Sequence, residues 1–384
     1  MAEGISISHV VGMCTFAAGF VTLFWLRRFR RPHVLHYCFA VLVLWMSMTF
    51  FWSVARELTA VRVGSLLQLL LMVWLIWEFA PSQSDQIALL GSYVLGSYVS
   101  AFSTIYAFLT HTGTNLGLAE GRYTATGFDE NELGVTLALS LVMSFYLLAR
   151  RLWWWPLWLL HIPICIFAIV LTGSRGGFIT TAVAALIFPL TLTKIKRVHR
   201  WALVSILIAF GVSAATIIPS SSLQRLGTIW GEVSAREGTL GMRTSIWAAG
   251  IDVYRQHPIT GVGFGAFGPS VYSRLDIAYV AHNSYLSILV ELGLVGAALF
   301  GALILCLFYI GFSLSGLERR LWTVLLLTWS VAVLSLTWEH RKPTWFLFGL
   351  LIAQSNALQH PSGTRMVGEC HLPERRRNLS HVPA

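Results

Sequence analysis

His282 is the strongest candidate for a catalytic base in this sequence. It lies in the segment AHNSYLSILVELGLVG, where a long connection enters an apolar run. A histidine of ordinary pKa can take a proton from a hydroxyl group at neutral pH. We therefore predict that His282 is a base and that its polar neighbours Asn283 and Tyr285 bind the substrate. A satisfied structural histidine is the alternative.

Two arginines stand beside apolar runs in settings that favour binding of an anion. Arg175 lies in TGSRGG between two apolar segments, and Arg122 lies in GRYTATG just before the acidic DENE run. The planar guanidinium grips phosphate oxygens with two hydrogen bonds, and flanking glycines let the backbone approach a ligand. This pattern indicates an anionic ligand such as a lipid diphosphate. The alternative is that these arginines contact lipid headgroups and nearby acids.

The sequence indicates no metal or cofactor site. The acids Asp129, Glu130 and Glu132 are dispersed, and no CxxC or Cys/His spacing typical of zinc occurs. We expect no metal ion and no cofactor, so that stabilisation of a diphosphate falls to the arginines.

The composition places these residues in a membrane protein. The chain has 384 residues, of which 56% are hydrophobic and only 11% charged. A soluble domain carries about 25% charged residues, and the 13% aromatic content excludes a disordered chain. We predict an all-α polytopic membrane protein with about 11–12 transmembrane helices. Eleven apolar segments are visible, near 8–26, 34–53, 62–80, 87–109, 132–149, 152–172, 177–193, 201–219, 284–313, 321–338 and 344–357.

The basic residues report the orientation of these segments. Dense clusters follow alternate segments, at Arg27–Arg31, Arg150–Arg151, Lys194–Arg200, Arg319–Arg320 and Arg375–Arg377. The positive-inside rule makes all of them cytoplasmic. Residues 1–357 are then one integral membrane domain with a large outer loop at 220–282, and residues 358–384 are a polar cytoplasmic tail. The net charge of +10 therefore indicates orientation rather than nucleic-acid binding.

The large outer loop combines two kinds of local structure. Apolar residues recur at helical spacing from Ile246 to Tyr254, which predicts a short amphipathic helix near the interface. The following segment HPITGVGFGAFG is punctuated by glycine and must turn tightly. Long structured loops are usually functional, so we expect the chemistry on the outer face.

Several of these segments together resemble one known family. TGSRGG, GMRTSIWAAGIDVYRQHPITGVGFGAFG and AHNSYLSILVELGLVG resemble the O-antigen ligase and O-antigen polymerase superfamily of bacterial envelope glycosyltransferases. RYTATGFDENELG and TWFLFGLL resemble its earlier and closing segments, so that the resemblance covers roughly residues 115–350. The family's ligases often have twelve spans, one more than the eleven counted here.

The resemblance implies an activity and a set of roles. The donor would be a glycan linked to undecaprenyl diphosphate, and the acceptor a sugar hydroxyl of lipid A core or a growing polysaccharide. Arg122 and Arg175 would bind the diphosphate together with Arg243, and His282 would activate the hydroxyl, without metal. The protein would lie in the bacterial inner membrane, with its active site facing the periplasm.

Two alternatives stay open from the sequence. Some relatives in this superfamily are protein O-oligosaccharyltransferases, and the motifs do not separate them from ligases and polymerases. A small-solute transporter is a rival of another class, which would place ionisable residues deep within the spans. Such residues are few here: Glu78 is near a cytoplasmic end, and Glu291 lies about two turns into its segment.

Overall fold

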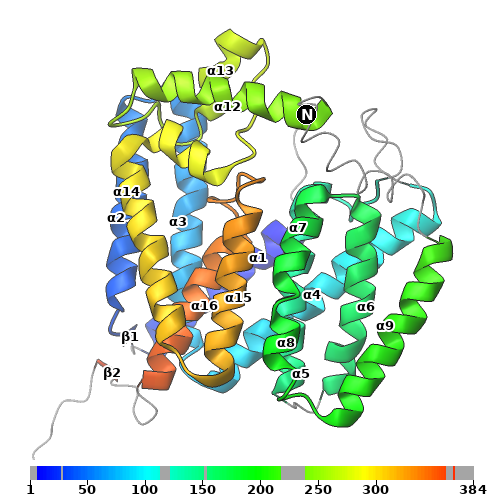
Figure 1. The fold of residues 1–384 in the computed structure, drawn as a ribbon. Helices are drawn as coiled ribbons and strands as arrows, with labels where there is room; N and C mark the ends of the chain where they lie inside the picture. Colours follow the sequence, from blue (N-terminus) through cyan, green and yellow to red (C-terminus); the bar gives the residue numbers. More distant parts are fainter. Residues whose placement is uncertain are drawn as a thin grey trace, which may run out of the picture.

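The computed structural model is a bundle of α-helices with an almost complete absence of β-structure among the described residues (Figure 1). It describes residues 7–26, 29–112, 122–150, 154–217, 238–359 and 366–367. The described elements are α1 (Ile7–Leu26), β1 (Phe29–Arg30), α2 (Val34–Met48), the 3₁₀ helix η1 (Thr49–Phe51), α3 (Arg56–Phe79), α4 (Gln83–Leu109), α5 (Glu130–Ala149), α6 (Trp155–Thr172), α7 (Arg175–Ala184), α8 (Ile187–Thr191), α9 (Arg197–Ile217), α12 (Gly238–Gln256), α13 (Phe267–Leu275), α14 (Ser284–Ser313), α15 (Gly316–Ala332), α16 (Lys342–Gln359) and β2 (Met366–Val367). The predicted all-α polytopic class is confirmed.

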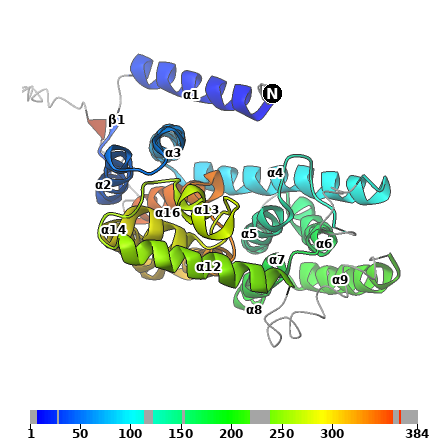
Figure 2. The ribbon, with the colours of Figure 1, turned by 90° about the horizontal axis from the view of Figure 1, so that it is seen from above.

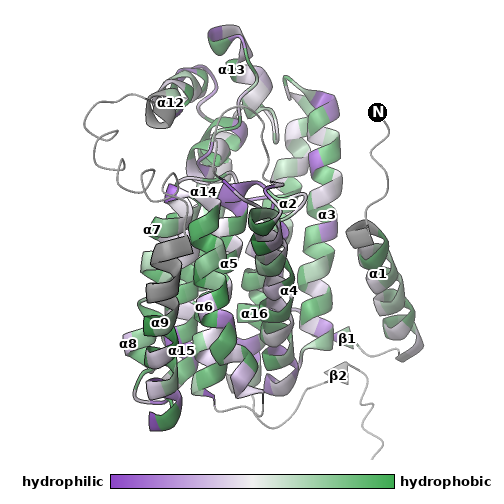
Figure 3. Ribbon diagram, turned by 90° about the vertical axis from the view of Figure 1, so that its right-hand side faces the viewer, coloured by the Kyte–Doolittle hydropathy of each residue, from purple (hydrophilic) through white to green (hydrophobic). Residues whose placement is uncertain are grey.

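The membrane-spanning character lies in the long apolar helices. Six of the described helices are long and apolar enough to cross a membrane, namely α2 with η1, α3, α4, α5, α6 and α14. All eleven apolar segments of the sequence coincide with helices, but the other five are shorter or less apolar. Figure 3 shows apolar residues along the bundle and more hydrophilic ones towards its two ends.

The segment expected to be one span at 177–193 is instead divided into α7 and α8. Pro189 lies in this stretch. A proline has no N–H to donate to the carbonyl four residues earlier, so the regular helix cannot run through it undisturbed. The first of the two short helices begins at Arg175, which is where the sequence placed a functional arginine.

The core of the bundle is centred on α5. Every residue from Leu133 to Ala149 except Thr136 is buried, and the helix packs against α4, α6, α7 and α15. By contrast α1 lies at the edge of the molecule, where Phe20 contacts Trp74 of α3 (Figure 2). Because α5 is enclosed on all sides, its first turn has a fixed position, and the loops around it are held against that turn.

A break within α14 anchors the outer loop to the bundle. Gly293 has φ 66° and ψ −166°, which no helix accommodates. The neighbouring backbone groups bond to the loop instead: Leu294 N–H donates to the Pro258 carbonyl (2.8 Å), and the Glu291 carbonyl accepts from Gly263 N–H (2.9 Å). Irregular backbone in a membrane helix persists only when its polar groups are paired in this way.

The two ends of the bundle differ in what they carry. Helices α12 and α13 cover one end, whereas β1, the end of α5 and the turn between α14 and α15 lie at the other (Figure 1). The predicted amphipathic helix is confirmed as part of α12, and the predicted tight turns are confirmed by positive φ at Gly261, Gly263 and Gly265. Of the loop expected at 220–282, residues 220–237 lie outside the described residues, as does most of the expected tail.

Candidate active site

Arg122 is held against the ends of two buried helices. Its Nε donates to the Thr172 carbonyl at the end of α6 (2.9 Å), and Nη2 donates to the Asn131 Oδ1 atom in α5 (3.2 Å). An ion pair joins Nη1 to Glu130 over 3.6 Å. Five donors in a rigid fork allow one guanidinium to bind several partners at once. The loop before α5 is therefore fixed with its arginine between the end of α6 and the start of α5.

Arg175 begins α7 next to this loop. The preceding Ser174 caps the helix by accepting from Gly177 N–H (3.0 Å), and its hydroxyl donates to the Asn131 Oδ1 atom (2.9 Å). Asn131 thus joins the Arg122 loop to the start of α7. The N-terminus of a helix favours anions, because its first N–H groups are unpaired and its dipole is positive there.

The glycines around Arg175 serve helix packing, which differs from the role expected for them. Gly173 ends α6 in the left-handed conformation, with φ 55°. Gly177 faces Gly134 of α5 so closely that a Cβ atom on it would lie 3.1 Å from the Gly134 Cα atom. Their small size brings α7 onto α5 and places Arg175 beside Asn131. Their predicted use in approaching a ligand stays a prediction.

Arg243 comes from α12, far from the other two arginines in sequence. Burial lowers the pKa of Arg243, Asp129 acts to raise it, and the charges of Arg122 and Arg175 lower it further. These electrostatic effects show that the fold brings the three arginines together with Asp129. We call Arg122, Arg175 and Arg243 the arginine cluster. Like charges repel, so an anion bound among them would be stabilised.

His282 is held in an unusual backbone conformation just before α14. Its φ of 47° lies in the left-handed region, which costs most non-glycine residues about 1–2 kcal/mol. Neighbouring contacts fix it on both sides. The Trp247 indole of α12 donates to the Ala281 carbonyl (2.9 Å), and Asn283 caps α14 by accepting from Tyr285 N–H (3.0 Å) and Leu286 N–H (3.1 Å).

The charge of Arg243, one member of the arginine cluster, acts on the ring of His282. Burial lowers the pKa of His282 below its ordinary value, Arg243 lowers it further, and Asp129 acts to raise it. None of these causes is a hydrogen bond, and the ring is only half-buried. A neutral imidazole in this position can accept a proton from a hydroxyl group.

Asp129 is a member of the site that sequence reasoning did not single out. It caps α5 by accepting from Asn131 N–H (2.9 Å) and Glu132 N–H (3.2 Å), and its charge acts on both Arg243 and His282. The acidic run DENE at the start of an apolar segment is the sequence feature that could have indicated this role of Asp129. Only the fold shows that one of its acids faces a histidine 153 positions later.

The structure gives Asn283 and Tyr285 local partners. The Asn283 side-chain oxygen is used as the helix cap, and the Tyr285 hydroxyl donates to the Ser330 carbonyl (3.3 Å). Both residues adjoin His282, but neither is among the charges that shift its pKa. Their predicted contact with substrate stays a prediction.

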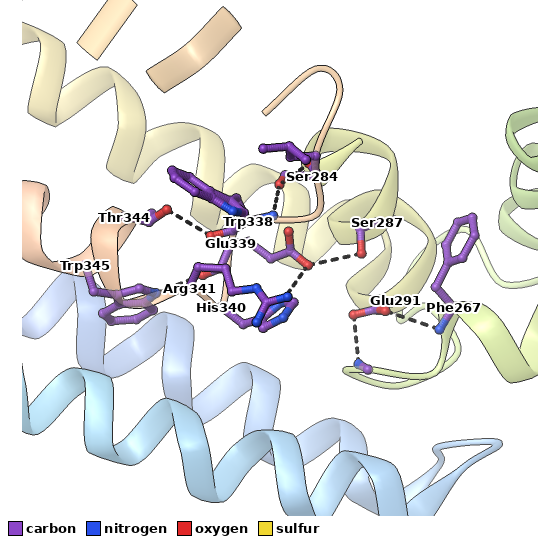
Figure 4. Close-up of polar contacts among 12 residues, drawn as sticks. Phe267, Ser284, Ser287, Glu291, Trp338, Glu339, His340, Arg341, Thr344 and Trp345 are labelled. Atoms are coloured by element: carbon purple, nitrogen blue, oxygen red, sulfur yellow. Dashed lines mark hydrogen bonds and ion pairs between the residues drawn. The ribbon is translucent and has the colours of Figure 1, made fainter. Parts of the chain in front are cut away.

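Glu291, the acid expected deep in a span, has a structural role. Its carboxylate accepts from Gly265 N–H (2.8 Å) and Phe267 N–H (3.2 Å), which ties the glycine-rich loop and the start of α13 to α14 (Figure 4). A buried polar group is tolerated when such hydrogen bonds satisfy it. Within the described ranges, no group of three or more His, Cys, Asp or Glu side chains could hold a metal ion.

Fold and site together define a multi-pass α-helical membrane protein with clustered arginines and a histidine at one end of the bundle. Residues 160–301 match the family model described as O-antigen ligase. This match includes Arg175, Arg243 and His282, and over these residues it supports the resemblance to the O-antigen ligase and polymerase superfamily that the motifs predicted. The match supports a membrane glycosyltransferase of the ligase or polymerase type in general terms. No curated protein matches the chain.

Proposed function

We propose that the protein transfers a glycan from undecaprenyl diphosphate to a sugar hydroxyl of lipid A core or of a growing polysaccharide. The observation that carries this proposal is the hydrogen bond from Trp247 to the Ala281 carbonyl, which joins the helix of Arg243 to the segment of His282. The charge of Arg243 accordingly lowers the pKa of His282, and the charges of Arg122 and Arg175 lower the pKa of Arg243. A base and an anion-binding cluster in one place are what such a transfer requires.

The arginine cluster binds the diphosphate of the donor in this proposal. Arg175 at the start of α7 adds the helix dipole to its own charge, and Arg122 is oriented by Asn131. The leaving diphosphate gains negative charge as the glycosidic bond breaks, so the cluster stabilises the transition state more than the ground state. The step needs no metal ion, because the arginines supply the positive charge.

His282 acts as the base that activates the acceptor. The acceptor oxygen attacks the anomeric carbon of the donor, its proton passes to the His282 ring, and the bond from that carbon to the phosphate oxygen breaks. The electron pair of that bond leaves with undecaprenyl diphosphate. A single displacement of this kind inverts the anomeric configuration, and product linkages that retain it would refute the mechanism.

The reaction takes place at the periplasmic face of the bacterial inner membrane in this proposal. The basic ends of α5, α9 and α15 point away from α12, and the positive-inside rule makes them cytoplasmic (Figure 1). Residues 1–357 then form a single membrane domain with a periplasmic loop at 220–282 and a cytoplasmic tail at 358–384.

Gene deletion followed by gel analysis of surface polysaccharide tests this function. Loss of the whole ladder would indicate a ligase, and a single-repeat band would indicate a polymerase. An unchanged polysaccharide with unglycosylated protein would indicate the alternative protein O-oligosaccharyltransferase. Loss of solute uptake with no glycan phenotype would reverse the proposal in favour of a transporter, which the structural bonding of Glu291 does not favour.

A further inference from the structure

A small polar cavity borders the segment that carries His282. Its volume is about 40 Å³, and it lies between α3, α14 and the connection from α15 to α16. The lining residues that matter here are Arg62, Ala281, Glu291, Thr337, Glu339 and His340. None of the three arginines of the cluster lines it. The cavity is therefore a second feature of the site, with chemistry of its own.

Three polar atoms in the wall of this cavity have no hydrogen-bond partner among the described residues. They are Glu339 Oε2, His340 Nε2 and the Thr337 hydroxyl. The Glu339 side chain is only 2% exposed, and its other oxygen accepts from the Ser287 hydroxyl (3.2 Å) and lies 3.4 Å from His340 Nδ1 (Figure 4). Buried polar groups in proteins are almost always paired, so these atoms indicate a bound partner.

The mixture of groups selects a neutral partner. A cation would be repelled by Arg62 and an anion by Glu339, so that a charged ligand of either sign is disfavoured. Burial acts to raise the pKa of Glu339, but its hydrogen bond to His340 and the charge of that residue outweigh burial and lower the pKa. A carboxylate accepts a hydrogen bond strongly from an O–H group, and the threonine hydroxyl can donate one in return.

The size of the cavity sets how much of a ligand enters. About 10–15 Å³ of such space holds one water molecule, so 40 Å³ accommodates a small group such as a hydroxymethyl arm. A hydroxymethyl arm offers one O–H on a short apolar stem. It would place that O–H at Glu339 while the ring stays outside.

The position of the cavity favours the acceptor over the donor. Ala281 lines the cavity, and the next residue is the proposed base, on which the charges of Arg243 and Asp129 act. Arg341, beside His340, forms an ion pair with Glu132 of α5, which ties the cavity wall to the helix that carries Asn131. The base must contact the acceptor hydroxyl, so an acceptor anchored one residue away is well placed for attack.

We propose that this cavity is an acceptor subsite, in which Glu339, His340 and Thr337 bind a hydroxymethyl arm of the acceptor sugar while His282 deprotonates the reacting hydroxyl. The proposal rests on the glycosyl transfer proposed above. Glu339 and its two neighbours are binding residues here and take no part in proton transfer.

The test is a transfer assay with the full-length protein reconstituted in lipid vesicles. The probes are the acceptor glycan and the lipid-linked donor, each isolated from the gene-deletion strain and titrated separately. We expect Glu339→Gln to raise the KM for the acceptor about tenfold or more, because a charged hydrogen bond is lost, while the KM for the donor stays the same. Thr337→Val should raise the acceptor KM by a smaller factor, about two- to tenfold.

The matched control is Asp252→Asn, which changes an exposed carboxylate of α12 to an amide. It should leave both KM values unchanged. If Glu339 has only a structural role, its variant lowers the active fraction and the melting temperature without changing the acceptor KM. That result would overturn the subsite and leave the cavity with ordered water only. If Glu339→Gln does not fold, an unchanged acceptor KM in Thr337→Val overturns it equally.

Failure of the subsite is distinguishable from failure of the proposed function. Absence of glycan transfer by the unaltered protein, when both donor and acceptor are supplied, would refute the function itself. Transfer that depends on His282 but shows no change of acceptor KM in Glu339→Gln and Thr337→Val would refute the subsite alone.

Discussion

The Trp247 indole donates a hydrogen bond to the Ala281 carbonyl over 2.9 Å, which joins α12 to the residue just before His282. The same helix carries Arg243, four positions earlier. One contact therefore sets the position of the proposed base relative to one of the three arginines. Its geometry depends on the outer loop folding back onto the bundle through α14 and the break at Gly293.

Trp247→Phe should lower the transfer rate without abolishing it. The substitution keeps an aromatic ring but removes the donor, and one neutral hydrogen bond contributes about 0.5–1.5 kcal/mol, or about two- to tenfold in rate. We expect kcat to fall while the KM for the donor is little changed, as measured in reconstituted vesicles. Equal kcat in the two proteins would show that this contact does not position the histidine.

Removal of the His282 ring should abolish most of the transfer. General bases contribute about 10²–10⁴-fold to rate, so we expect a loss of at least about a hundredfold. His282→Asn is a cleaner variant than His282→Ala, since asparagine tolerates the left-handed backbone found here. Both variants should still insert in the membrane and bind the donor. Normal transfer by His282→Asn would rule out the proposed base.

The pH dependence of kcat/KM should report the lowered pKa of His282. The neutral ring is the active form, so activity should fall as the pH drops through a pKa below the ordinary value near 6.5. Arg243→Gln removes a positive charge, which should raise this pKa and move the acid limb to higher pH. Asp129→Asn keeps a helix cap but removes a negative charge, which should move the limb to lower pH.

Arg243→Gln and Asp129→Asn should move the acid limb in opposite directions. General damage to the site would lower the activity in both variants without producing such opposite shifts. The position of the limb is the readout, since Arg243→Gln should also weaken donor binding. Shifts in the same direction, or none, would show that the limb belongs to another group.

Arg175→Lys should impair transfer although the charge is kept. Lysine cannot grip a diphosphate with two parallel hydrogen bonds, and one charged hydrogen bond is worth about 1.5–3 kcal/mol, so kcat/KM for the donor should fall about tenfold or more. Arg255→Lys on the exposed face of α12 is the matched control and should have no effect. Full activity of Arg175→Lys would assign this arginine to lipid headgroups instead.

Gly293→Ala should destabilise the protein strongly. A Cβ atom at Gly293 would lie 2.2 Å from the Ile259 carbonyl oxygen, and the positive φ already disfavours any side chain. Gly301→Ala in the same helix is the control, because a Cβ atom there meets nothing within 4 Å. We expect a marked fall in melting temperature for the first variant only. Similar melting curves would mean that the loop contact at the break is dispensable.

Much of the fold follows from local properties of the chain. Long apolar runs must form helices in a membrane, since every backbone group has to be paired there, and this determines the all-α class. The helical spacing from Ile246 to Tyr254 and the glycines after His257 are likewise local signals, and both were interpreted correctly. The division of the 177–193 segment was missed, although Pro189 is the signal that could have indicated it.

The sequence by itself determined the class of protein and named the residues able to do chemistry, because residue types, hydropathy and motifs are properties of short stretches. Only the tertiary structure decided which of them meet. Arg122, Arg175, Arg243 and His282 come from four separate segments, and Asp129, Asn131 and Trp247 join them through contacts that no spacing in the chain encodes. The cavity at Glu339 arises in the same way, from three helical elements that pack around one polar space.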